Sequence, residues 1–114
     1  MSHSVEQHFE GRAATVRDIY DTLLAAAHEF GPVDEDPKKT SIHLNRKSAF
    51  AGIQTRREFL ILTVKSTGDI DSPRVSNREQ ASAHRWYHEV KITNCDDIDN
   101  QIIGWLRDSY ELSG

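Results

Sequence analysis

Residues 40–64, TSIHLNRKSAFAGIQTRREFLILTV, indicate a β-sheet, because apolar and polar residues alternate along most of this stretch. A period of two residues is typical of β-strands that bury one face. The pattern predicts strands at residues 40–44, 48–53 and 58–64, with short polar connections between them. Connections this short join antiparallel strands. We therefore expect an antiparallel meander at the centre of the domain.

Two amphipathic helices flank these strands. Apolar residues recur at helical spacing over residues 13–30, and Gly31-Pro32 follows as a stop signal. A short helical turn is expected before them, at residues 5–9. A second helix is expected after Asn94, which would cap it together with Asp97 three residues later. Its apolar stripe is wide enough to lie on a sheet, so we expect both helices on the same sheet face.

The sequence between residues 66 and 93 contains one more strand and one irregular segment. Residues 85–93 alternate again, which predicts a strand with His88 beside Trp86 and Val90 on its apolar face. Residues 66–84 show no clear period and are longer than most ordered loops. Residues 77–82 suggest one helical turn, in a flap over the sheet or in a loop that covers a strand edge.

These elements predict an α+β fold in a single domain, residues 1–114. The antiparallel sheet should have four to five strands, with the N-terminal and C-terminal helices packed on one face. The other face of the sheet then stays partly open. The sequence contains no stretch long and apolar enough for a membrane span and no signal peptide. We expect a cytoplasmic protein that does not contact a membrane.

The charges of the chain are unevenly distributed. Residues 38–91 contain eleven of the fourteen lysines and arginines but only five of the eighteen acidic residues, a net charge of 11 − 5 = +6. The remaining residues carry 3 − 13 = −10. A polarity of this kind indicates a surface that faces an anion, although a basic strand face is often simply solvated.

The sequence carries no motif for catalysis, for a cofactor or for a metal. No serine, cysteine or carboxylate stands in an arrangement that marks a nucleophile, so an enzyme is the less favoured interpretation. His84 and His88 have the spacing of helical metal ligands, but four strand residues separate them by roughly 13 Å. We therefore expect no metal site and no cofactor.

The favoured hypothesis is a binding domain for an anionic, phosphate-bearing ligand, with nucleic acid as one candidate. The sequence pI of 5.8 favours a small ligand or a local contact over extended duplex binding. A second hypothesis is a small-molecule pocket or enzyme under the flap, and a third is a homodimer that pairs through the open sheet face. The candidate ligand-binding residues are Lys38, Lys39, Ser41, His43, Arg46, Arg56, Arg57 and Arg74, with Ser82 and His88 added by the second hypothesis.

Five segments carry a resemblance to a known family, and they extend over nearly the whole chain. They are VEQHFEG at residues 5–11, PKKTSIHL at 37–44, AFAG at 49–52, DSPR at 71–74 and GWL at 104–106. The chain resembles a family of small bacterial domains of unknown function, which are also appended to predicted transport proteins and to restriction-endonuclease-like proteins. These fusion partners imply that nucleic acid is the favoured ligand, but the resemblance implies no activity. The chain departs from the family pattern at Thr55, where proline is expected, and at Asn94-Cys95, where Ser-Pro is usual.

Overall fold

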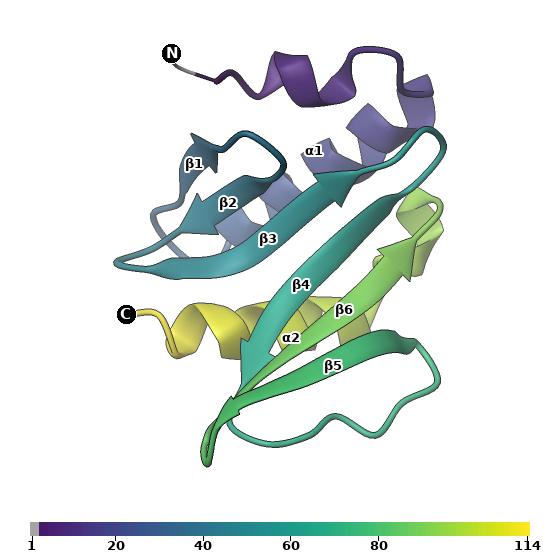
Figure 1. Ribbon diagram of the computed structural model, residues 1–114. Coiled ribbons are helices and arrows are strands. Elements are labelled where there is room, and N and C mark those ends of the chain that lie inside the picture. The colour runs from purple at the N-terminus through teal and green to yellow at the C-terminus, as the bar shows by residue number, and fades with distance from the viewer. Residues whose placement is uncertain (1–2) are drawn as a thin grey trace.

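The computed structural model describes residues 3–114 and confirms the α+β class. Figure 1 shows one antiparallel sheet with two α-helices behind it. In chain order the elements are η1 (Glu6–Phe9), α1 (Ala14–His28), β1 (Asp34–Pro37), β2 (Ile42–Asn45), β3 (Ala49–Thr55), β4 (Leu60–Ser66), β5 (Val75–Ser82), β6 (Arg85–Ile92), η2 (Cys95–Asp97) and α2 (Asn100–Glu111).

The sheet has six strands in the order β1-β2-β3-β4-β6-β5, so the expected number of four to five strands was too low. The two additional strands, β1 and β5, form the two edges of the sheet. Neither has an alternating apolar pattern, because each sequence, DEDP and VSNREQAS, is mostly polar. Backbone pairing with β2 and β6 holds them in the sheet. Such pairing requires no particular side-chain pattern in the edge strand.

Strand β5 corrects two expectations about residues 66–84. The helical turn predicted at residues 77–82 was wrong, since these residues pair with β6. The segment also does not fold over the sheet as a flap, because β5 extends the sheet at its edge and only residues 67–74 remain as a loop (Figure 1). One face of the sheet is therefore open, as expected, and it is wider than the sequence predicted.

Both α-helices pack on one face of the sheet, as predicted (Figure 1). Burial alternates along β4, where Leu60, Leu62 and Val64 point to the helices and are almost completely buried. Each such side chain stabilises the fold by roughly 1.5–3 kcal/mol when it leaves water. No helix within residues 3–114 has the length and apolar character needed to cross a bilayer.

The C-terminal helix begins later than predicted. Asn94 and Asp97 do form a capping box, but it closes only the single turn η2. The chain then bends, and α2 starts at Asn100, where the Asp99 carboxylate accepts a hydrogen bond from the Ile102 amide at 3.1 Å. Two caps follow each other within six residues, and the second one interrupts the continuous helix that the apolar spacing suggested.

Ser109 of α2 joins the sheet where β3 and β4 separate. The last direct pair of this ladder is Ala51 with Val64. At the next position the Ser109 hydroxyl lies between the strands, donating to the Phe50 carbonyl at 2.5 Å and accepting from the Lys65 amide at 3.0 Å. The helix thus supplies the hydrogen bonds that the two strands would otherwise make to each other, and it fixes the backbone of Lys65.

Candidate anion-binding site

The open face of the sheet contains a hollow of about 280 Å³ over β2, β3, β4 and β6. Its floor is low because Gly52, which pairs with His43 and Thr63, has no side chain and the Ala49 side chain is small. The Phe50 side chain does not fill the hollow either, since its ring packs edge-on against Tyr110 of α2 with centroids 5.0 Å apart. The residues around the hollow are Ser41, His43, Ala49, Phe50, Ala51, Gly52, Gln54, Thr63, Val64, Lys65 and Tyr87.

Lys65 is a buried lysine in this hollow. It follows Val64 at the end of β4, so its side chain points away from the helices, and only 7% of its surface is exposed. The ammonium group donates to the Ser48 hydroxyl at 3.2 Å, and no ion pair within residues 3–114 includes it. Burial, together with the nearby Arg85 guanidinium, lowers the pKa of Lys65 below its usual 10.5. The hollow therefore holds a positive charge that lacks a counter-ion among the described residues.

Arg85, at the start of β6, is a second cation next to Lys65. Lys65 pairs with Tyr87, and Arg85 lies two residues before Tyr87 on the same sheet face. The Arg85 Nε atom is buried without a hydrogen-bond partner, and Arg85 takes part in no ion pair among the described residues. Buried polar atoms almost always have partners, so the Arg85 Nε atom is a donor with capacity for one further acceptor beside the Lys65 ammonium.

Two residues predicted for ligand binding, Ser41 and His43, lie at the opposite wall of the hollow. Strand β2 places His43 on the open face because its neighbours Ile42 and Leu44 are buried against the helices. Tyr87 of β6 completes the rim with its ring 40% exposed. The hollow therefore offers the Lys65 ammonium, polar hydrogen-bonding groups and one aromatic surface, and Arg85 lies next to Lys65.

Four further predicted residues gather at one end of the sheet, and we call them the basic end: Lys38, Lys39, Arg56 and Arg57. They belong to the β1–β2 and β3–β4 turns, which pairing of Ile42 with Ile53 places side by side. Arg56 donates to the Gln54 side chain at 3.2 Å, and Gln54 lines the hollow. Lys38 is partly neutralised by Asp36 at 2.9 Å, whereas Lys39 and Arg57 have no ion pair within residues 3–114.

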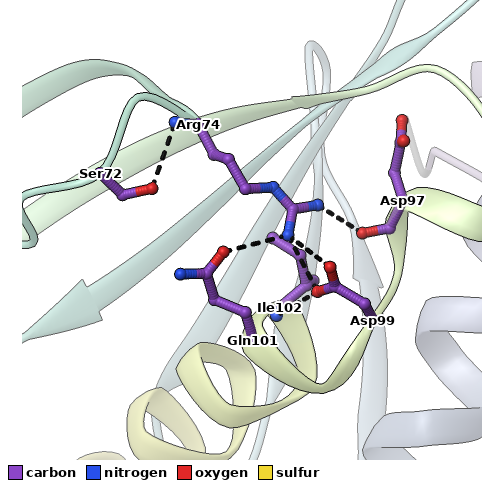
Figure 2. A network of polar contacts seen from close by, with 6 residues as sticks. All are labelled: Ser72, Arg74, Asp97, Asp99, Gln101 and Ile102. Carbon is purple, nitrogen blue, oxygen red and sulfur yellow. Dashed lines mark hydrogen bonds and ion pairs between the residues drawn. The ribbon is translucent and has the colours of Figure 1, made fainter.

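Arg46 and Arg74 lie apart from the hollow. The Arg46 guanidinium sits 4.5 Å from the centre of the Tyr110 ring and donates to the Tyr110 carbonyl at 3.2 Å. Figure 2 shows Arg74 held by the start of α2, where it donates to both oxygens of Asp99 at 2.9 Å, to the Gln101 side chain and to the Asp97 carbonyl. Arg74 lowers the pKa of Asp99 and fastens the loop at residues 67–74 to α2.

His88 and Ser82 do not share a pocket with His43. His88 is completely buried on the helix-facing side of β6, where it stacks on Trp86 with ring centres 6.0 Å apart. Its Nε2 atom lies 3.0 Å from an Asp69 carboxylate oxygen, and its Nδ1 atom lies 3.3 Å from the Ser66 hydroxyl. Ser82 is exposed at the end of β5. The side chains proposed for a pocket under the flap are therefore distributed over both faces of the sheet.

Lys65 and Arg85 were not among the ligand-binding residues predicted from the sequence, and Tyr87 was not included with them. Continuing the alternation past residue 64 would have placed Lys65 on the open face with Thr63. Nothing in the sequence, however, indicates that β4 pairs with β6, a strand more than twenty residues further along the chain. That pairing is what brings the two cations and the aromatic ring together.

Comparison with protein families gives a match over nearly the whole chain. A family model described as "Domain of unknown function (DUF5655)" matches residues 5–113 of the chain. No curated protein matches the chain, and no solved structure does.

Proposed function

Because the chain belongs to this family, whose description assigns no activity, we propose a function from the geometry of the hollow: the domain binds a phosphate-bearing ligand there. Lys65 and Arg85 would carry the charge of the phosphate, and Ser41 and His43 would supply hydrogen bonds. The observation that carries the proposal is the pair of adjacent cations without a counter-ion within residues 3–114, one of them buried and the other with a buried unpaired nitrogen.

The chemistry of the two cations favours phosphate over other anions. An ammonium group donates up to three hydrogen bonds, and a guanidinium presents a planar fork of donors that matches phosphate oxygens. Burial of the ammonium and, in addition, repulsion by the neighbouring Arg85 guanidinium lower the pKa of Lys65. A dianion between them would offset both charges, whereas a single carboxylate would offset one. Hydrogen bonds between charged groups are roughly twice as strong as neutral ones, so the gain would exceed that from polar contacts alone.

Replacing Lys65 with methionine is expected to weaken phosphate binding by at least about tenfold, the factor that corresponds to a loss of ~1.4 kcal/mol. The same change should leave the melting temperature unchanged or raise it, because methionine fills a similar volume without a buried, unpaired charge. Titration calorimetry with inorganic phosphate and pyrophosphate at low salt measures the first effect, and calorimetric unfolding measures the second.

The matched control is Lys91→Met. Lys91 is also on the open face, but its ammonium lies 4.3 Å from the centre of the Phe59 ring, outside the hollow. Loss of binding in both variants, or in neither, would count against a site at Lys65. The melting curve shows whether the Lys65→Met protein is folded. If it is unfolded, Lys65→Gln replaces it in the same titrations.

The affinity for sulfate is expected to fall as pH rises toward the alkaline range. Sulfate keeps its charge over that range, so a loss of affinity reflects a change in the protonation of the protein. The anion binds the protonated ammonium, and the pKa of Lys65 in the unliganded protein lies below 10.5. Deprotonation should therefore weaken binding at a lower pH than for an ordinary lysine. In Lys65→Arg the guanidinium stays charged, so its affinity should stay flat, and a parallel fall in both proteins would contradict the assignment.

A further inference from the structure

We propose that the hollow is one section of a track for single-stranded nucleic acid, which crosses the open face from Lys65 and Arg85 to the basic end. This inference rests on the proposed phosphate site and extends it by naming the ligand. One phosphate would occupy the hollow, a neighbouring base would stack on Tyr87, and further phosphates would reach Lys39, Arg56 and Arg57.

The distance between the two groups of cations requires a long ligand. Gln54 pairs with Ile61, four residues before Lys65 on β4, so the ends of the hollow are separated by roughly 13 Å. Arg56 contacts the Gln54 side chain and lies further from Lys65 still. A single phosphate cannot reach both groups, whereas the sugar-phosphate backbone places charges at regular intervals along its length.

Tyr87 indicates a single strand. At 40% exposure it is the one large apolar side chain that stands exposed within residues 3–114. It lies directly opposite Lys65 across the β4–β6 pair, where neighbouring side chains are about 5 Å apart. Aromatic rings on a sheet or groove stack with unpaired bases, and adjacent cations hold the backbone. In a duplex the bases stack on each other and leave no face for Tyr87.

Acidic residues border the proposed track on both sides. Asp36 pairs with His43 on the β1 side, and Glu79 pairs with Tyr87 on the β5 side, so both carboxylates lie on the open face. Glu89 lies on the same face opposite Thr63. These charges repel phosphates and leave the middle of the sheet, over β3 and β4, as the passage between the two groups of cations. Because acidic residues limit the track on both sides, the nucleic acid would contact only a small part of the surface of a protein with a net charge of −4.

Fluorescence anisotropy with labelled single-stranded DNA and RNA of about ten nucleotides, and with the matching duplex, tests the proposal. We expect both single strands to bind more tightly than the duplex. If about three phosphates are neutralised, the affinity should fall roughly 20-fold when salt rises from about 50 to about 200 mM. Tighter binding of the duplex, or binding that is independent of salt, would overturn the proposal.

Two variants test the two ends of the track. Tyr87→Leu keeps an apolar strand residue but removes the aromatic ring, and it should weaken oligonucleotide binding about tenfold while weakening the binding of inorganic phosphate by a smaller factor. Arg56→Glu combined with Arg57→Glu should abolish oligonucleotide binding. The charge-matched control is Arg17→Glu combined with Arg107→Glu, on the two helices behind the sheet, and it should bind as the unmodified protein does.

The outcomes separate this inference from the proposed function. Phosphate binding that depends on Lys65, with no binding of any oligonucleotide, would overturn the track and leave the phosphate site. Oligonucleotide binding that is equally weak in the control and in the basic-end variant would also overturn it. No binding of phosphate or of oligonucleotide would overturn both proposals.

Discussion

Replacing Ser109 with alanine is expected to lower the free energy of unfolding by about 2–4 kcal/mol. Its hydroxyl is completely buried and serves two backbone groups, the Phe50 carbonyl and the Lys65 amide. Alanine leaves both groups buried without partners, and each such group costs about 1–3 kcal/mol. Chemical denaturation monitored by Trp86 and Trp105 fluorescence measures the change.

Two comparisons make the Ser109 prediction specific. Ser76 also donates its hydroxyl to a backbone carbonyl, that of Glu89, but it lies exposed on the edge strand β5. Ser76→Ala should therefore change stability by less than about 0.5 kcal/mol. Because Ser109 fixes the backbone of Lys65, Ser109→Ala should also weaken phosphate binding in the fraction that stays folded. Equal stability losses in the two serine variants would contradict the role given to Ser109.

Replacing Tyr110 with alanine is expected to lower the free energy of unfolding by about 3–5 kcal/mol, the usual cost of removing a buried aromatic ring. The ring is 97% buried, since only 3% of Tyr110 is exposed, and it packs against Phe50 and Phe30. It also carries the Arg46 guanidinium on one face. Alanine would leave a cavity where α2 meets the start of β3, directly behind the hollow.

Tyr110→Phe separates the hydroxyl from the ring. The hydroxyl donates to the Pro32 carbonyl at 3.0 Å and lies where a side chain on Gly31 would collide with it. Losing this single hydrogen bond should cost about 1 kcal/mol. Thermal and denaturant unfolding of both variants checks the expected order. A phenylalanine variant as unstable as the alanine variant would place the energy in the hydroxyl instead of the ring.

The sequence predicted the elements that have an apolar period. The helix at α1, the three central strands and β6 all have buried residues at regular spacing, so their types and approximate positions could be inferred locally. Strands β1 and β5 could not, because edge strands of polar residues form through backbone pairing with a neighbour. The same limit explains the helical turn that was wrongly expected at residues 77–82.

Charge and alternation were enough to predict where some of the candidate residues lie. Ser41 and His43 line the hollow as the alternation of β2 indicated, and the lysines and arginines of the two turns do lie together. Arg74 and His88 were grouped with them because they are chemically suitable, but the sheet separates the two from the hollow. A sequence gives the charge of an arginine, but it does not show with which carboxylate the guanidinium forms an ion pair in the fold.

The fold class, the buried face of each central strand, and the basic middle of an acidic chain could all be inferred from the amino-acid sequence. These properties depend on residues close together in the chain. The pairing of β4 with β6, the entry of Ser109 into the ladder, and the juxtaposition of Lys65 and Arg85 without a counter-ion among the described residues depend on the tertiary fold. The physical reason is that pairing between distant strands is selected by the packing of the whole core, whereas alternation within one strand is selected by its own residues.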